Sequence, residues 1–177
     1  RYTLFPYTTL FRSSAGCSTG EEPYSIAMVL RETLPTTGWD VKILATDLDS
    51  NVLATAERGV YEWNRVKELP ETRLRRWFQK GGGEQAGLVR AAPVLRSLIT
   101  FRQLNLMDDW PMSGPFDVVF CRNVVIYFDK PTQRTLFDRF ADLLIEQGHL
   151  FVGHSESLFK VTERFAPLGK TIYRKCR

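Results

Sequence analysis

Short apolar runs alternate with longer amphipathic segments along most of this chain, and this alternation predicts the order of its secondary structure. The run from Val41 to Thr46, "VKILAT", is short, β-branched and bounded by polar residues, so it predicts a buried strand that ends at Asp47. A second apolar run spans Phe116 to Cys121 and follows a Gly-Pro turn. The segments "HLFVGHS" and "KTIYRKC" predict two further strands, the second of them at the edge of the sheet.

Helices are predicted between these strands. In "DLDSNVLATAERG", Asp49 or Ser50 can cap the first turn, and Gly59 supplies a left-handed stop. Another helix is expected to begin near Pro131 and to end at Gly148. Its apolar residues recur at helical spacing: Leu136, Phe137, Phe140, Leu143 and Leu144.

Strands that alternate with helices of this length predict an α/β fold, a mainly parallel sheet with helices on both faces, because parallel neighbours need crossover connections. The region from about residue 61 to residue 104 departs from this rhythm. It holds a basic helical segment around "ETRLRRWFQK", a triple-glycine loop, and two extended segments, "GLVRAA" and "LITFRQLNL". We therefore expect a small inserted β-subdomain at about residues 61–104.

The composition fits one globular domain. The chain has 177 residues, of which 44% are hydrophobic and 25% are charged, and this is enough to bury a core. No apolar run reaches the roughly 18 to 20 residues that span a bilayer, and the N-terminus lacks the order of a secretory signal. We therefore expect a cytoplasmic protein without membrane insertion, and we expect a monomer.

Charge and cysteine content argue against several other classes. The formal net charge of +4 is modest, and the basic residues after position 70 fit a solvated helix face. Neither an aromatic-interleaved basic motif nor a zinc-finger spacing is present, so no nucleic-acid partner is expected. The cysteines Cys17, Cys121 and Cys176 lie far apart without a C-x-x-C pair, which favours reduced thiols over a disulfide framework or a metal site.

Candidate chemistry begins in the segment "SAGCSTGEEPYS". Small residues from Ala15 to Gly20 lead into an amphipathic helix, and such a turn lets backbone amides approach a ligand closely. Its glycines do not fit the dinucleotide pattern G-x-G-x-x-G, so this loop alone is a weak signal. Asp47 strengthens it, because a carboxylate at the end of the next strand can bind ribose hydroxyls, although it could instead cap the following helix.

Two more strand ends carry polar residues, Asn105 in "LNL" and Arg122 with Asn123 in "CRN". In a parallel sheet these residues point toward the same crevice as Asp47, and open α/β sheets bind their ligands there.

The sequence around these strand ends resembles a known family. The similar segments are "AGCSTGEEPYSIAM", "ATDLDSNVLATAERGVY", "GLVR", "LNL", "GPFDVVFCRNVVIYFDKPTQ" and "LFVGHSESL". From about Ser14 to the C-terminus they resemble the catalytic domain of CheR-type chemotaxis methyltransferases. The resemblance implies a Rossmann-like class I methyltransferase fold and an enzyme that uses S-adenosylmethionine (SAM), yielding S-adenosylhomocysteine (SAH). Its implied partners and substrates are chemoreceptor cytoplasmic domains, whose glutamate side chains become methyl esters.

The resemblance also implies roles for individual residues. The methionine part of the cofactor would lie against the glycine loop and the two glutamates after it. The ribose would lie against Asp47, and the adenine between Asn105 and Leu106. The residues implied for the cofactor are Ala15, Gly16, Cys17, Gly20, Glu21, Glu22, Asp47, Asn105, Leu106, Arg122 and Asn123.

The resemblance implies that Arg90 and Tyr127 help to position the incoming glutamate. Arg90 could instead be a surface strand residue, and Tyr127 a core aromatic with a hydrogen-bonded hydroxyl. We expect His154 in "GHSES" to be structural rather than a general base. A glutamate side chain, with an ordinary pKa of about 4.3, is already ionised at neutral pH, so the reaction needs alignment rather than proton removal.

The first residues stand outside this pattern. Family members carry a first central strand before the glycine loop, preceded by a helical domain, and the sequence shows neither. The run "TLFPYTTLFRS" matches the in-frame translation of a widely used sequencing-library adapter, so we expect residues 1–13 to be a non-native leader and residues 14–177 an N-terminally truncated catalytic domain. Its composition predicts that Tyr7 to Phe11 fills the vacant strand position. Such a chain is expected to be unstable or inactive.

Two alternatives remain open at this point. One is a class I methyltransferase that acts on a small molecule or a nucleic acid. The other is a non-catalytic module whose inserted subdomain grips a receptor tail by strand addition.

Overall fold

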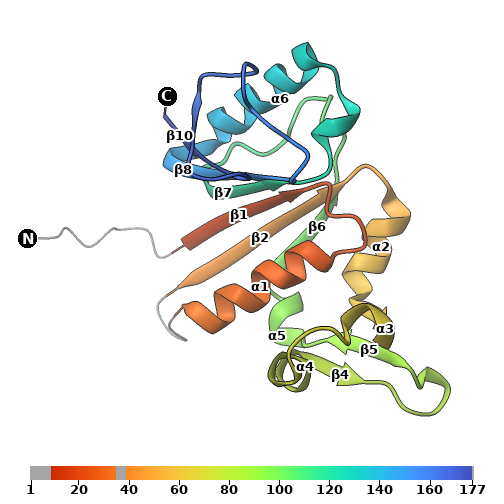
Figure 1. The fold of residues 1–177 in the computed structure, drawn as a ribbon. Helices are drawn as coiled ribbons and strands as arrows, with labels where there is room; N and C mark the ends of the chain where they lie inside the picture. Colours follow the sequence, from red (N-terminus) through yellow and green to blue (C-terminus); the bar gives the residue numbers. More distant parts are fainter. Residues whose placement is uncertain (1–8, 35–38, 177) are drawn as a thin grey trace, which may run out of the picture.

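The computed structural model describes residues 9–34 and 39–176, which form a large and a small β-sheet (Figure 1). The strands of the large sheet are β1 (Thr9–Ala15), β2 (Asp40–Asp47), β6 (Ile99–Gln103), β7 (Phe116–Cys121), β8 (Leu144–Val152), β9 (Phe165–Pro167) and β10 (Ile172–Lys175). They lie in the order β6-β2-β1-β7-β8-β10-β9. The first five run parallel to one another, whereas β10 pairs antiparallel with β8 and with β9. The predicted mainly parallel sheet is therefore confirmed.

Helices cover both faces of this sheet. The helices beside it are α1 (Glu21–Thr33), α2 (Ser50–Arg58), α5 (Pro93–Arg96) and α6 (Lys130–Leu143). Side chains alternate along β2, so Ile43 packs in the hydrophobic cluster of α1, whereas its neighbour Leu44 packs against the cluster of α6. The helices α1 and α6 therefore lie on opposite faces, as predicted. Among residues 9–34 and 39–176, no helix is long and apolar enough to cross a bilayer.

Local signals set the ends of α2 as expected. The Asp49 carboxylate accepts a hydrogen bond from the backbone N–H of Asn51 at 2.7 Å, and Gly59 closes the helix at φ 61°. The predicted end of α6 at Gly148 is wrong, because the helix ends at Leu143 and β8 begins at Leu144. Gly148 instead lies within an irregularity in the pairing of β7 with β8, and a Cβ there would lie 2.9 Å from the Ile145 carbonyl oxygen.

The C-terminal strand does not lie at the sheet edge, which corrects a second expectation. Strand β10 pairs with β8 on one side and with β9 on the other. The edge belongs to β9, a three-residue strand that ends at Pro167. A short outer strand tolerates proline because its outward N–H is not needed in the sheet.

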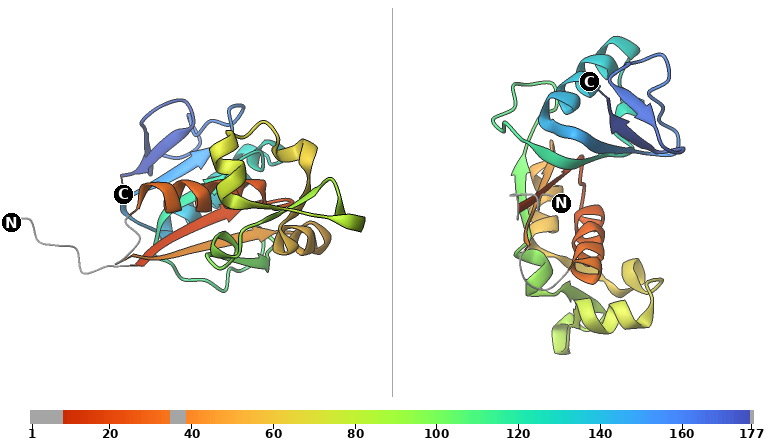
Figure 2. Two further views of the ribbon diagram at one scale, coloured as in Figure 1. Left: turned by 90° about the horizontal axis from the view of Figure 1, so that it is seen from below. Right: turned by 90° about the vertical axis from the view of Figure 1, so that its left-hand side faces the viewer.

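The small sheet is formed by β3 (Val60–Glu62), β5 (Leu88–Ala91) and β4 (Phe78–Lys80), in that order and antiparallel. Its connections carry α3 (Trp63–Val66), α4 (Glu71–Trp77) and the 3₁₀ turn η1 (Gly83–Gln85). It lies at one end of the molecule, with α6 and β10 at the other (Figures 1 and 2). The segment "ITFRQ" pairs with β2 as β6, so the small sheet ends at Ala91 and the predicted boundary at residue 104 lies too far along the chain.

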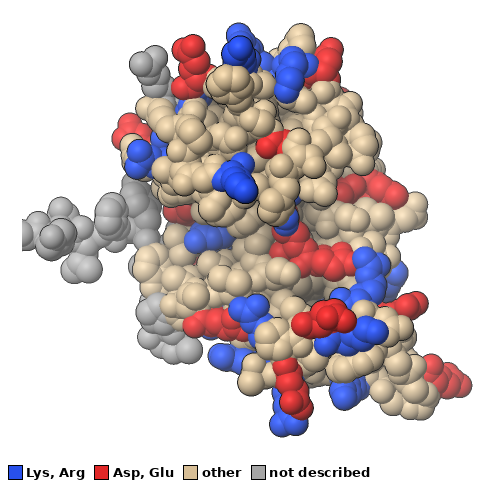
Figure 3. Space-filling view, viewed as in Figure 1, with Lys and Arg blue, Asp and Glu red and all other residues tan. Residues whose placement is uncertain are grey.

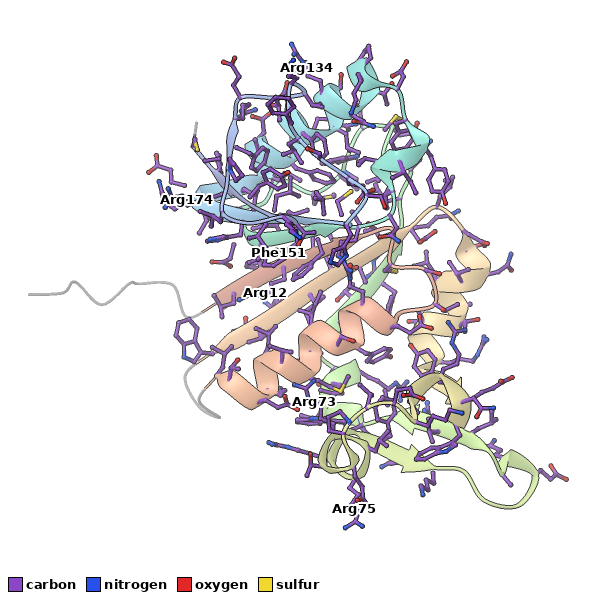
Figure 4. The ribbon with its side chains drawn as sticks, viewed as in Figure 1. Arg12, Arg73, Arg75, Arg134, Phe151 and Arg174 are labelled. Carbon is purple, nitrogen blue, oxygen red and sulfur yellow. The ribbon has the colours of Figure 1, made fainter. Side chains whose placement is uncertain are left out.

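A group of hydrogen bonds near the surface links α4, beside the small sheet, to α1. On α1, Glu32 accepts hydrogen bonds from Trp77 Nε1 at 2.8 Å and from Arg73 Nε at 3.0 Å, both on α4 (Figure 4). These hydrogen bonds lower the pKa of Glu32, the bond from Arg73 contributing most.

Strand β1 occupies the central position that the sequence left vacant. Of the predicted segment Tyr7–Phe11, the residues from Thr9 onward pair with β2, and the strand continues to Ala15. Tyr7 and Thr8 lie outside the described residues. The strand is unusually polar for a central one, since it buries Ser13, Ser14 and much of Arg12. Burial lowers the pKa of Arg12, and the charge of Asp117 partly opposes this shift.

Candidate functional site

The carboxyl ends of four parallel strands, β1, β2, β6 and β7, lead into turns at one rim of the sheet. A cavity of about 360 Å³ lies among these turns. Its lining residues are Gly16, Ser18, Asp47, Leu48, Leu104, Asn105, Leu106, Met107, Asn123, Val124, Tyr127 and Phe128. A cavity of this size falls within the usual range for small-molecule sites, and its place is the one expected for an open α/β sheet.

The first loop, residues 16–20, connects β1 to α1. Its start is fixed by hydrogen bonds from the N–H groups of Gly16 and Cys17 to the Thr46 carbonyl oxygen, at 2.8 and 2.9 Å. Gly16 has φ 79°, and a Cβ there would lie 2.4 Å from Val124 Cγ2. Gly20 caps α1 at φ 95°. Only glycine fits at Gly16, because the backbone is left-handed and pressed against the turn after β7.

The buried cysteines beside the rim are not reactive thiols. Cys17 is only 3% exposed, and burial, helped by the charge of Asp47, raises its pKa to about 12. Burial also raises the pKa of Cys121, with the charge of Glu156 acting in the same direction. Both thiols are therefore protonated at neutral pH, which suits packing rather than nucleophilic chemistry.

Asp47 lies at the centre of the rim. One carboxylate oxygen accepts from the Ser18 N–H at 2.8 Å, and the other accepts from the Asp49 N–H at 3.1 Å. The cap of α2 is Asp49, so the alternative role of Asp47 as a helix cap is excluded. Asp47 braces the first loop and still has lone pairs to offer to a ligand in the cavity.

The turn after β6, residues 104–107, forms the next part of the cavity wall. The Leu104 N–H donates to the Asp47 carbonyl oxygen at 2.9 Å, which ties this turn to the end of β2. Asn105 closes the turn by accepting from the Met107 N–H at 3.0 Å. The Leu106 carbonyl oxygen accepts from Arg139 Nη1 at 2.9 Å. The two residues predicted beside the adenine therefore line the cavity from a well-anchored turn.

The second loop, residues 122–128, follows β7 and contains the 3₁₀ turn η2 (Val125–Tyr127). Asn123 adopts a left-handed conformation at φ 61°, which is uncommon for a residue with a side chain. Tyr127 is 80% exposed at the mouth of the cavity. The alternative interpretation of Tyr127 as a core aromatic is therefore wrong.

Three residues predicted for the cofactor line a different hollow. Glu21, Glu22 and Arg122 border a space of about 700 Å³ between α1 and the strands β7 and β8. Arg122 Nη1 lies 3.2 Å from Glu22, which also accepts from the Ser14 hydroxyl at 2.8 Å. Because side chains alternate along β7, Arg122 points to the face of α1, whereas the next residue, Asn123, borders the rim cavity.

This larger hollow exposes part of the central sheet. Arg12 on β1 and Phe151 on β8 lie on the same face above α1 (Figure 4). Basic and acidic side chains lie across the middle of this face (Figure 3). This hollow is lined by apolar residues of α1, β7 and β8 and by several charged side chains, whereas Asp47 is the one charged residue among the described residues that line the rim cavity.

Arg90 lies apart from both hollows. It is exposed on β5, where it borders a separate depression of about 430 Å³ in the small sheet together with Arg58 and Lys80. This placement favours the alternative of a surface strand residue, and its predicted role toward a substrate stays a prediction.

Sequence reasoning missed Glu156 and Gln133, which hold the second loop from behind. In the segment "GHSES", sequence reasoning considered His154 alone. His154 is exposed, whereas Glu156 is 5% exposed. The available signal was a glutamate four residues after the end of an apolar strand, at the rim where the other polar residues gather. A second signal was the glycine three residues before it.

The arrangement as a whole suits a nucleoside-containing ligand. Asp47 offers a carboxylate to hydroxyl groups, Asn105 and Leu106 offer a polar and an apolar surface, and Gly16 permits close approach of the backbone. Parallel strands in this order, with the ligand cavity at their carboxyl ends, define the class I methyltransferase fold. The DszA carbon methyltransferase shares this fold, with a TM-score of 0.51 and 18% sequence identity over 85% of this chain and 30% of that one.

The family is narrower than the fold. Residues 10–174 match the family described as "CheR methyltransferase, SAM binding domain", and the chain belongs to this family. SAM is thus its cofactor, and both the resemblance seen in the motifs and the predicted fold class are confirmed.

Curated relatives of this chain are named chemotaxis protein methyltransferases. Chemotaxis protein methyltransferase 2 of Pseudomonas aeruginosa is 46% identical over 161 residues, which cover 90% of this chain and 58% of that protein. The chemotaxis protein methyltransferase of Escherichia coli is 45% identical over 90% of this chain and 56% of its own length. The probable enzyme of Rhizobium etli is 43% identical over 91% and 61%. The chain therefore spans somewhat more than half the length of these relatives.

Proposed function

We propose that this chain is the SAM-binding catalytic domain of a protein-glutamate O-methyltransferase that acts on chemoreceptors during chemotactic adaptation. The main support is that, in a chain of this family, four strand ends converge on one cavity bordered by Asp47, Asn105 and Asn123. The relatives are named chemotaxis protein methyltransferases, and the motif resemblance adds the receptor glutamates as the substrate class. The proposed substrates are glutamate side chains of receptor cytoplasmic domains, and the proposed place of action is the cytoplasm.

Different rim residues hold different parts of the cofactor. Asp47 accepts hydrogen bonds from ribose hydroxyls, and each such charge-assisted bond contributes about 1.5 to 3 kcal/mol. Asn105 and Leu106 flank the adenine, and the first loop lies against the methionine part. SAM supplies a methyl group bound to a positively charged sulfur, which a carboxylate oxygen can attack.

The chain's own task in the reaction is alignment. A receptor glutamate is ionised at neutral pH, so no side chain has to remove a proton, and exposed His154 is not needed as a base. Correct placement of reacting groups can supply roughly 7 to 11 kcal/mol of a barrier in favourable cases. Tyr127, exposed at the mouth of the cavity, is well placed to orient the incoming side chain and to cover it from water.

Transfer of labelled methyl groups from SAM to a purified receptor cytoplasmic fragment tests this function. The expected product is labelled, alkali-labile and located on glutamate. Label on a small molecule or a nucleic acid instead would favour a methyltransferase with another acceptor. Calorimetry with SAH addresses the remaining alternative, because a non-catalytic receptor-binding module should show no heat of cofactor binding.

A further inference from the structure

The second loop is organised around one buried carboxylate. Glu156 lies in the turn after β8 and accepts four backbone hydrogen bonds, two on each oxygen. One oxygen accepts from the N–H groups of Val124 and Val125 at 2.8 and 2.9 Å. The other accepts from the N–H groups of Asn123 and Gly153 at 2.9 and 2.6 Å. Three successive N–H groups that converge on one anion form an anion-binding nest, here filled by the protein's own side chain.

The surroundings of Glu156 leave little freedom for this arrangement. A Cβ added to Gly153 would lie 2.6 Å from Asn123 Oδ1 and 2.8 Å from Glu156 Oε2, so the strand end and the second loop fit together only with glycine there. From the other side, Gln133 Nε2 donates to the carbonyl oxygens of Val125 and Phe128 at 2.9 and 3.0 Å. Acceptors and donors of the loop are thus both engaged by buried side chains from other elements.

The residues held in this way border the cofactor cavity. Asn123 and Val124, whose N–H groups bond to Glu156, line it, and Tyr127 lies two residues after Val125 in the same turn. Val124 also packs against Gly16 of the first loop. A change in the nest would therefore move the cavity wall, the contact with the first loop, and the tyrosine at the mouth.

We propose that Glu156 is a positioning residue for the cofactor, which holds Asn123, Val124 and the turn of Tyr127 in the conformation that binds SAM. This inference rests on the proposed function only in identifying the occupant of the cavity as SAM. Glu156 does not touch the ligand but acts through the backbone of the second loop. Its carboxylate must accept all four hydrogen bonds, because any N–H left unpaired in this buried place is costly.

The decisive variant is Glu156→Gln, which keeps the size of the side chain but turns one acceptor oxygen into an NH₂ group that faces N–H donors. We expect the affinity for SAH, measured by calorimetry, to fall about tenfold or more. In the ligand-free protein, the amide protons of Asn123, Val124 and Val125 should exchange faster with solvent. Gly153→Ala, which leaves the carboxylate intact but pushes on Asn123, should weaken SAH binding in the same way.

The control is Val161→Ala, which removes buried apolar atoms from the same half of the molecule without touching the nest. It should lower the melting temperature and leave the SAH affinity within about twofold of wild type, both measured where circular dichroism shows folded protein. Equal SAH affinity in Glu156→Gln and wild type would overturn the proposal, as would an equal loss in Val161→Ala. Tight SAH binding without receptor methylation would instead contradict the proposed substrate and leave the role of Glu156 intact.

Discussion

The strands β1 and β7 lie side by side in the sheet, and each leads into a loop that borders the cofactor cavity, yet the two units are built differently. Strand β7, "FDVVFC", is apolar apart from Asp117, whereas β1, "TLFRSSA", buries serines and part of an arginine. The first loop is shaped by its own glycines and by the neighbouring end of β2. The second loop has no glycine and is shaped by Glu156 and Gln133, which come from other elements. The comparison shows that the first loop takes much of its shape from its own glycines, whereas the second loop depends on side chains from α6 and from the turn after β8.

Loss of the Asp47 carboxylate should have the largest effect on cofactor binding. Asp47→Ala removes the acceptor of the Ser18 N–H and the carboxylate proposed for the ribose, so we expect SAH affinity to fall about a hundredfold. Calorimetry with SAH measures this. Asp49→Ala is the matched control, because it removes only the cap of α2 and should cost about 1 kcal/mol of stability with little change in affinity. Equal affinity in Asp47→Ala and wild type would remove the ribose assignment.

Gly16→Val should break the first loop itself. The valine would adopt a left-handed conformation, and its Cβ would lie 2.4 Å from Val124 Cγ2, so we expect a loss of about 3 kcal/mol in the free energy of unfolding. Urea denaturation measures it. Gly82→Val is the control, since Gly82 is extended and has nothing within 4 Å of its added Cβ. Similar losses in both variants would show that the loop is not shaped locally.

Gln133→Leu should weaken the second loop by removing its support from α6. It leaves the buried carbonyl oxygens of Val125 and Phe128 without their donors at 2.9 and 3.0 Å, with an expected cost of about 2 kcal/mol. Urea denaturation again provides the measurement, and the exposed Gln85→Leu serves as the control. A neutral effect at Gln133 would mean that Glu156 alone holds this loop.

Arg12→Leu should stabilise the protein by making β1 more apolar. In the described part of the chain, Arg12 Nη1 is buried without a hydrogen-bond partner, and burial disfavours its charge. Replacing it by an apolar side chain should raise the stability by about 1 kcal/mol, seen as a higher melting temperature. Arg75→Leu, at a highly exposed site on α4, should change it little. A lower melting temperature in Arg12→Leu would contradict the view that β1 is a poor fit in the sheet.

The smallest effect concerns the cap that follows the second loop. The Asp129 carboxylate accepts from the Thr132 N–H at 2.9 Å, and its hydrogen bonds to Thr132 lower its pKa below the ordinary 3.8. Its stabilisation is thus complete at neutral pH and is lost as the pH falls below 3.8 toward the lowered value. Asp129→Ala should have a slightly lower melting temperature than wild type at pH 7, and the difference should shrink in acid. A difference that grew in acid would contradict a stabilising role of the ionised Asp129 carboxylate.

Much of the fold and part of the site could be predicted, because their signals are local. The strands β2 and β7, the helix α2 with its Asp49 cap, and the rim position of Asp47 follow from short apolar runs and from cap residues. The end of α6 could not be predicted, because Gly148 signals a helix stop and a strand irregularity equally well. The membership of β6 in the large sheet depends on its pairing with β2, which no local pattern specifies.

The sequence by itself determined the order of elements, the family and the glycine-shaped first loop, since periodicity, caps and motifs act over a few residues. Only the tertiary structure decided that Arg122 and Asn123 border different hollows, that Arg90 lies on the small sheet, and that Glu156 holds the second loop. Those outcomes depend on which face a strand turns to its neighbours, and on hydrogen bonds between residues more than thirty positions apart. Such contacts exist only once the sheet has brought its strand ends to one rim.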